Sequence, residues 1–168
     1  MNKQIVTVAS VIGVVGAVLL GRLLGWMVGL QFLLPIFVGM WAARAFEHHK
    51  ARRFAAALGV QAGYLTWIAL GFIVDLHHAQ FYLAFWGALL HLIAVVGFVG
   101  LILQPGLPPA LLLILRHAYS LLLCILSLPS MIKAFNYVSR AAVVNVAITA
   151  AIAVASIVLL ARALKPEK

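Results

Sequence analysis

The chain has 168 residues, of which 66% are hydrophobic and 9% are charged, and its formal net charge is +9. An ordinary soluble domain carries roughly 25% charged residues to cover its surface. This composition therefore excludes a soluble globular domain and indicates an integral membrane protein. The basic residues stand at the ends and joints of apolar runs, which argues against nucleic acid as a partner and indicates contact with anionic phospholipid.

The expected fold is an all-α transmembrane helical bundle of about six helices, in a single integral membrane domain over residues 1–168. One crossing needs roughly 20 predominantly apolar residues. The apolar runs predict spans at 5–20, 26–43, 54–74, 82–103, 110–128 and 141–164. Almost nothing is left for a domain outside the lipid bilayer.

The first apolar stretch continues too far for one crossing. A single helix from Ile5 to Ala43 would be much longer than a hydrocarbon core of about 30 Å. We expect a break at 21–25 (Gly-Arg-Leu-Leu-Gly), because glycine permits a turn and Arg22 would reach the headgroups. In a five-helix alternative, 5–34 is one tilted span, 35–43 is interfacial, and the amino terminus lies outside.

The joint at 42–53 carries the strongest topological signal. It contains four basic residues, one acid and two histidines: Arg44, Lys50, Arg52, Arg53, Glu47, His48 and His49. Short loops rich in lysine and arginine stay in the cytoplasm. Alternating the sides from this joint places both termini in the cytoplasm, in agreement with Lys3 and Lys165.

The later boundaries follow from prolines and polar turns. The third span ends at 75–78 (Asp-Leu-His-His), which has no lysine or arginine and is expected outside. The fourth stops at 104–109, where three prolines interrupt the helix, and the fifth is expected to end at Pro129. Lys133 and Arg140 fall on the predicted outer side, which leaves an alternative in which 131–140 lies along the interface.

Small residues recur at every fourth position across the first two spans. They are Ala9, Gly13, Ala17, Gly21, Gly25 and Gly29. Such a face lets two helix backbones approach closely. We expect Gly21, Gly25 and Gly29 to contact either another helix of this chain or another subunit.

Polar residues inside the spans are the remaining candidates for a site, because polar groups rarely face lipid. Counting residues from each connecting turn gives the expected depth of each side chain in the membrane. This count predicts a polar layer near the midplane, which would be either a site or a set of helix–helix hydrogen bonds. Its members are Gln31, Thr66, His91 and Asn145.

Arg116 stands about two turns from the start of its span and has no acid at a comparable depth. It would snorkel to phosphates, bind an anionic lipid, or meet an acid of a partner. With Tyr119 and Ser120 it predicts a patch that binds a lipid headgroup or a partner.

No cofactor or metal is expected. His91 and His117 differ in predicted depth by about 7 Å, which makes them a poor pair of haem ligands. Asp75, His77 and His78 lack a further ligand that would complete a metal set. Cys124 is the single cysteine, so an internal disulfide is impossible. The chain shows no phosphate loop, nucleophile motif or carboxylate pair, so an enzyme is not expected.

Three functions remain open. The leading hypothesis is a non-catalytic subunit of a bacterial-type inner membrane, which packs against other membrane subunits or copies of itself and stabilises or regulates a larger complex. The alternative is a small carrier or channel for a lipid or small solute. The third is a redox subunit associated with haem or quinone.

Overall fold

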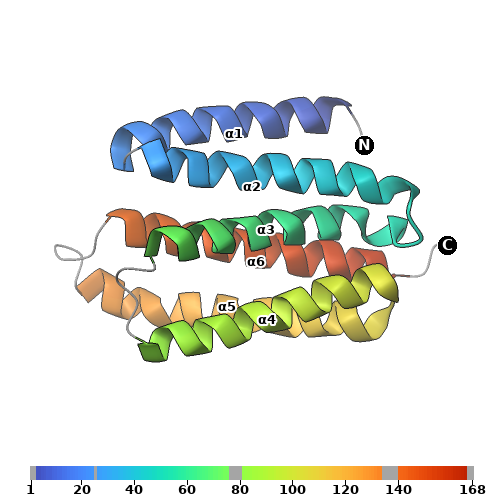
Figure 1. Cartoon of the computed structure of the whole chain (residues 1–168). Coiled ribbons are helices and arrows are strands. Elements are labelled where there is room, and N and C mark those ends of the chain that lie inside the picture. Colours follow the sequence, from blue (N-terminus) through green and yellow to red (C-terminus); the bar gives the residue numbers. More distant parts are fainter. Residues whose placement is uncertain (1–2, 25, 76–80, 134–139, 166–168) are drawn as a thin grey trace.

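The computed structural model describes residues 3–24, 26–75, 81–133 and 140–165. Over these residues the chain is built from helices and short turns (Figure 1). The helices are α1 (Lys3–Leu24), α2 (Trp26–Ala45), α3 (Ala55–Asp75), α4 (Phe81–Leu103), α5 (Leu107–Lys133) and α6 (Arg140–Leu164). The predicted all-α bundle of six helices is confirmed. The five-helix alternative is wrong, because two separate helices cover its first span.

The break between α1 and α2 comes at the end of the segment expected to contain it. Helix α1 continues through Gly21 and Arg22 to Leu24, and α2 begins at Trp26. Gly25 lies outside the described residues. The whole stretch up to Leu24 is therefore helical, although glycines inside it permit a turn.

Helix α5 differs most from its expected bounds. It begins at Leu107 and continues through Pro129 to Lys133, so the predicted end at Pro129 is wrong. Pro108 and Pro109 stand in its first turn, where the amide hydrogens have no helical acceptor and a proline removes nothing. Helices in apolar surroundings also tolerate an internal proline when neighbouring groups satisfy the freed carbonyl. Of the segment expected along the interface, 131–133 continue α5 and 134–139 lie outside the described residues.

The helices alternate in direction. The outer ends of α1 and α6 therefore lie at the same end of the bundle as 46–54 and as the turn between α4 and α5 (Figure 1). We call this end the basic end. Among the described side chains, its exposed cations are Arg44, Lys50, Arg52, Arg53, Arg162 and Lys165.

Two side chains of the basic joint fasten it to the ends of distant helices. Lys50 Nζ donates a hydrogen bond to the carbonyl oxygen of Leu103, 2.5 Å away, at the last residue of α4. Arg53 Nη2 donates to the carbonyl oxygen of Lys165, 2.7 Å away, just after α6. Carbonyls at a helix C-terminus lack an amide partner and carry the negative end of the helix dipole. The cations thus hold the joint against both helices.

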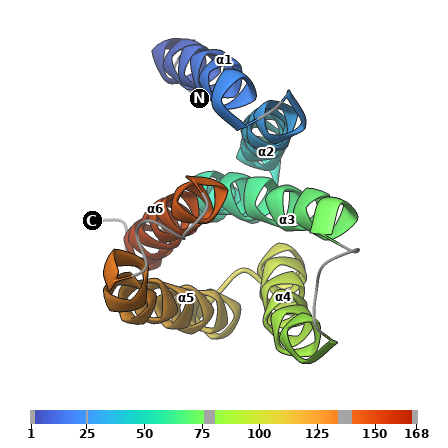
Figure 2. The same cartoon turned by 90° about the vertical axis from the view of Figure 1, so that its left-hand side faces the viewer.

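Helices α3 to α6 form a ring, which we call the four-helix unit (Figure 2). Each helix of this unit contacts the next one in the chain, and α6 contacts α3, which closes the ring. The hairpin of α1 and α2 lies outside the unit and packs on α3 through α2. The interior of the molecule is therefore the space enclosed by α3 to α6.

A layer of leucines fills the four-helix unit near the basic end. Each helix of the unit contributes one fully buried leucine to the same hydrophobic cluster: Leu58, Leu101, Leu113 and Leu160. None of the four has exposed side-chain surface, so this leucine layer closes the interior of the unit toward the basic end. Any polar group beyond it is separated from water on that side.

Glycines bring α2 and α3 into close contact. A Cβ added at Gly63 would lie 2.7 Å from the Pro35 carbonyl oxygen, and one at Gly59 would lie 2.6 Å from that of Gly39. Real Cβ atoms do not approach oxygen so closely, so only glycine fits at these two positions. The spacing Gly59-x-x-x-Gly63 is the small-residue pattern of tightly packed membrane helices.

The composition of the helices places the chain among membrane proteins. Three stretches within the described residues are long and apolar enough to cross a bilayer, namely Gly29–His48, Leu107–Ser130 and Val146–Leu164. Large apolar side chains such as Ile12, Leu19 and Leu126 are exposed on the outer faces. Exposed apolar faces of this size are covered by lipid or by another protein, not by water.

Candidate functional site

A cluster of polar side chains fills the four-helix unit immediately beyond the leucine layer. Gln61 follows Leu58 by one turn of α3, and His117 follows Leu113 by one turn of α5. The cluster is completed by Tyr64 of α3, His91 of α4 and Arg116 of α5. Gln61, Tyr64, Arg116 and His117 are all buried. We call these five residues the polar cluster.

Arg116 is the centre of this cluster and is only 5% exposed. Its Nη2 donates a hydrogen bond to the Tyr64 hydroxyl, its Nε donates to the Leu90 carbonyl oxygen at 3.4 Å, and its Nη1 lies 3.3 Å from His117 Nδ1. The guanidinium carbon also lies 4.3 Å from the centre of the Tyr64 ring. The side chain therefore points into the bundle and does not snorkel to a membrane surface.

The chemistry of these contacts determines which ring nitrogen of His117 carries hydrogen. A guanidinium has only donors, so the Arg116 contact requires Nδ1 of His117 to accept. The hydrogen of the neutral ring is then on Nε2. Two Gln61 side-chain atoms lie near it, Nε2 at 2.8 Å and Oε1 at 3.1 Å, and of these only Oε1 can accept the hydrogen. The result is a directed chain of hydrogen bonds from Arg116 through His117 to Gln61, and it joins α5 to α3.

His91 completes the cluster from α4. Its ring lies edge-on to Tyr64, with 6.5 Å between ring centres, and the ring of Tyr64 also lies 5.2 Å from that of His117. Tyr64 thus contacts both histidines as well as Arg116. One tyrosine brings together polar groups from three helices.

The positive charge of Arg116 is not neutralised by any carboxylate among the described side chains. Its three hydrogen-bond partners are a phenol, a backbone carbonyl and an imidazole, all of them neutral. Glu47, the acid whose side chain is described, lies in the joint at the basic end. A buried charge without an opposite charge is costly in apolar surroundings, even when it is hydrogen-bonded.

Two hollows border α5. One is a groove of about 430 Å³ between α4 and α5, and we call it the α4–α5 groove. Arg116 and Tyr119 are its polar lining residues, and the rest of its wall is apolar: Leu89, Leu90, Ile93, Leu112, Leu115 and Leu123. The groove therefore combines one guanidinium and one tyrosine with a wall that is otherwise aliphatic.

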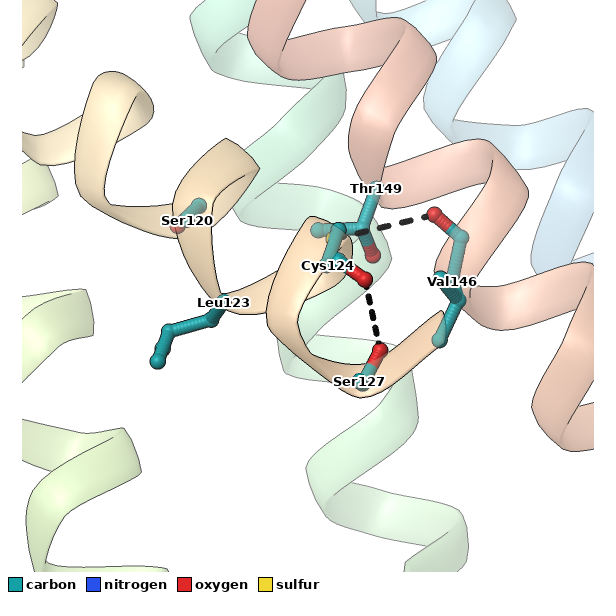
Figure 3. A pocket seen from close by; sticks show the side chains of 6 residues that line it. All are labelled: Ser120, Leu123, Cys124, Ser127, Val146 and Thr149. Atoms are coloured by element: carbon teal, nitrogen blue, oxygen red, sulfur yellow. Dashed lines mark hydrogen bonds between the residues drawn. The ribbon is translucent and has the colours of Figure 1, made fainter. Parts of the chain in front are cut away.

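The second hollow, of about 230 Å³, lies between α5 and α6 and is lined by small hydroxyl and thiol groups (Figure 3). Cys124 Sγ faces the Val146 carbonyl oxygen at 3.9 Å, and Ser127 Oγ donates to the Cys124 carbonyl oxygen at 2.7 Å. The first contact joins α5 to α6, and the second lies within α5.

The three residues of the patch predicted on α5 do not all face the same way. Arg116 and Ser120 are buried, whereas Tyr119 is 47% exposed. Arg116 and Tyr119 still share the α4–α5 groove, and Ser120 lines the hollow on the other side of the helix.

The predicted midplane layer is not brought together as a group. His91 belongs to the polar cluster, but Gln31 is on α2, outside the four-helix unit. Thr66 donates to the Ala62 carbonyl oxygen of its own helix at 2.9 Å. The side chain of Asn145 lies outside the described part of the chain.

The predicted glycine face joins α1 to α2 within the chain. A Cβ at Gly29 would lie 2.5 Å from the Ala17 carbonyl oxygen and 3.1 Å from Gly21 Cα. Gly21 and Gly29 therefore bury their faces in the hairpin. Gly25, the third member, is not among the described residues.

Sequence reasoning missed the roles of Gln61, Tyr64 and His117. A signal for them existed, because Leu58, Gln61 and Leu65 recur at helical spacing, as do Leu113, Arg116 and Ser120. That spacing puts polar residues in line with core leucines, but it does not show which helix faces which.

The ring of His117 is not available as a metal ligand in this arrangement. Both ring nitrogens of His117 already have partners, so an iron ion could bind the ring only by displacing Arg116 or Gln61. No group of three histidine, cysteine or carboxylate side chains meets among the residues that the structure describes. Of the predicted outer cluster, the side chains of Asp75, His77 and His78 lie outside that description.

Comparison of the chain with family models, with curated proteins and with solved structures found no match. The function must be argued from the polar cluster and its surroundings.

Proposed function

We propose that the four-helix unit is a binding site for a small anionic molecule or lipid, in a non-catalytic membrane protein. The observation that supports this proposal is the buried guanidinium of Arg116, which is held by three neutral partners and lines the α4–α5 groove. This corresponds to the carrier alternative drawn from the sequence. The sequence offered His91 and Asn145 of the midplane layer as the carrier's site, and the proposal assigns the site to Arg116 instead.

The physical argument is one of charge compensation. A charged side chain within apolar surroundings costs several kcal/mol unless it is paired. An anion bound to Arg116 would supply the missing charge and accept charge-assisted hydrogen bonds, each contributing about 1.5–3 kcal/mol. The neighbouring Tyr64 and His91 would contribute further polar contacts.

The test is the thermal stabilisation of the purified protein by anions. Dodecanoate and inorganic phosphate are the probes, since one is amphiphilic and the other water-soluble, and a bound ligand raises the midpoint of unfolding. We expect at least one probe to raise the midpoint of the wild type, and Arg116→Gln to abolish that rise. Arg162→Gln, which removes an exposed arginine at the basic end, is the matched control and should retain it.

Two results would contradict the proposal. In the first, neither anion stabilises the wild type. In the second, Arg116→Gln responds to the probes as strongly as Arg162→Gln does. Because each variant is compared with itself in the presence and absence of the probe, a change in its own stability does not affect the conclusion.

The hypothesis of a subunit in a larger complex stays a prediction. Its best structural support is the hairpin, because α1 packs mainly on α2 and turns Val8, Val15 and Leu19 outward. A partner helix or lipid would cover this face. Measuring the protein mass of the particle extracted in a mild detergent separates these cases. Only a complex has a protein mass above the 18.1 kDa of one chain.

We also propose that the chain crosses a bacterial-type inner membrane several times, with its basic end in the cytoplasm against anionic phospholipid. The exposed cations at one end support this orientation. The test uses a Cys124→Ser background with Arg52→Cys in the joint. A membrane-impermeant maleimide should label inverted vesicles and leave intact cells unlabelled; the reverse pattern would overturn the orientation.

A further inference from the structure

We infer that the ligand of the polar cluster is a single-chain carboxylate dissolved in the bilayer, and that it reaches Arg116 sideways through the α4–α5 groove. This inference rests on the proposed function and specifies its substrate class and its route.

The first step concerns the route from water. The leucine layer, made of Leu58, Leu101, Leu113 and Leu160, stands between the basic end and the polar cluster, and all four of its side chains are fully buried. A hydrated anion arriving from that side would have to lose its water within an apolar constriction. The axial route from the basic end is therefore closed to a small soluble anion.

The second step concerns the position of the groove. Its lining on α5 extends from Leu112 to Leu123, five to sixteen residues after the helix begins at Leu107. At 1.5 Å per residue this corresponds to roughly 7 to 24 Å from the helix start, within the ~30 Å of a hydrocarbon core. The groove therefore faces acyl chains along its whole length.

The third step concerns the match between groove and ligand. Six of its eight lining residues are aliphatic, which suits a hydrocarbon tail, and Arg116 supplies one positive charge. Arg116 lies nine residues into α5, or about 13 Å from its start, deeper than a phospholipid headgroup rests. A single-chain carboxylate fits this arrangement, because its one tail would lie in the groove and its carboxylate would pair with the guanidinium of Arg116.

The experiment measures equilibrium binding of radiolabelled dodecanoate to the full chain in nanodiscs of neutral phosphatidylcholine. Acetate and inorganic phosphate are the soluble competitors, and dodecanol is the uncharged one. We expect dodecanoate to bind in an Arg116-dependent manner, with no displacement by either soluble anion at equal concentration. The affinity of dodecanol as a competitor should be lower than that of dodecanoate by about tenfold or more, because dodecanol lacks the charge.

Matched tryptophan substitutions test the groove. Leu112→Trp fills it from α5, while Leu111→Trp places the same side chain on a neighbouring exposed position that does not line it. We expect Leu112→Trp to lower dodecanoate affinity by about tenfold or more and Leu111→Trp to change it less than about twofold. Leu89→Trp and Leu92→Trp form an equivalent pair on α4 if either α5 variant does not fold.

The outcomes separate the two proposals. Arg116-dependent binding of acetate or phosphate as tight as that of dodecanoate would overturn the lateral route and leave anion binding intact. Dodecanoate binding that is equal in the groove variants and their controls would do the same. If no anion binds in an Arg116-dependent manner, the proposed function itself is wrong, and this inference with it.

Discussion

Arg116 and Tyr64 contact each other in two ways at once. The guanidinium donates a hydrogen bond to the tyrosine hydroxyl, and its central carbon lies 4.3 Å from the centre of the tyrosine ring. The hydroxyl supplies an acceptor and the ring face supplies the negative side of a quadrupole. Tyr64 is thus the residue of α3 that holds the buried charge of α5 in place.

This relationship predicts a penalty for Tyr64→Phe. The variant keeps the ring but removes the acceptor of Arg116 Nη2, and an unsatisfied buried donor costs about 1–3 kcal/mol. We expect the free energy of unfolding in mixed micelles to fall by that amount. Tyr119→Phe removes the hydroxyl of a half-exposed side chain on α5 and should change the free energy of unfolding by less than about 0.5 kcal/mol. Equal losses in the two variants would show that the contact to Arg116 does not stabilise the fold.

The chain of hydrogen bonds between Gln61 and His117 predicts strong coupling of the two residues. Gln61→Leu leaves the Nε2 hydrogen of His117 without its acceptor, and we expect a loss of about 1–3 kcal/mol in the free energy of unfolding. Adding His117→Leu removes the stranded donor as well, so the double variant should lose less than the sum of the single variants. Additive losses in this double-mutant cycle would argue against a direct bond.

The contact of Gly63 with Pro35 predicts that α2 and α3 cannot accommodate a methyl group between them. A Cβ at Gly63 would lie 2.7 Å from a backbone oxygen, which cannot move without shifting the helix. We expect Gly63→Ala to reduce the free energy of unfolding by about 1–3 kcal/mol. Gly13→Ala is the control, because its Cβ would meet only side-chain atoms, at 3.4 Å or more. A neutral Gly63→Ala would contradict the close approach.

The cations of the joint predict a small stabilisation that depends on salt. Lys50→Gln and Arg53→Gln each remove a hydrogen bond to the C-terminal end of a helix, which is worth about 0.3–1 kcal/mol for an exposed charge at low ionic strength. The difference should shrink at about 1 M salt, where the screening length is near 3 Å. Arg52→Gln alters an exposed neighbour with no such bond and should show neither effect. A loss that is independent of salt would indicate packing of the side chains instead of charge.

The number and order of the helices follow from the sequence, because hydrocarbon imposes a simple requirement. Backbone groups in lipid must be paired internally, so each apolar run of about 20 residues becomes a helix. The basic joint at 42–53 was likewise expected to lie on the same side as both termini, and it lies at the same end as the outer ends of α1 and α6. Helix ends were less certain, because the rule that prolines end helices holds in water, whereas α5 continues through Pro129.

The grouping of polar side chains was decided by the tertiary structure. The depth of a residue along its helix can be counted from the sequence. The face that each helix turns toward its neighbours cannot be counted here, because the few polar residues of helices such as α2 and α3 form no polar stripe that marks an outer face. Gln31 and Gln61 are thus alike in sequence, yet only Gln61 meets His117.

The sequence by itself determined a basic bundle of six apolar helices with one arginine deep in a span. The reason is that the hydrocarbon core of a membrane sets both the composition and the length of each apolar run. Only the tertiary structure decided that Arg116 turns inward onto Tyr64 and His117. That choice depends on which small residues let helices approach and which helices close the ring. Those are properties of packing between segments distant in the chain.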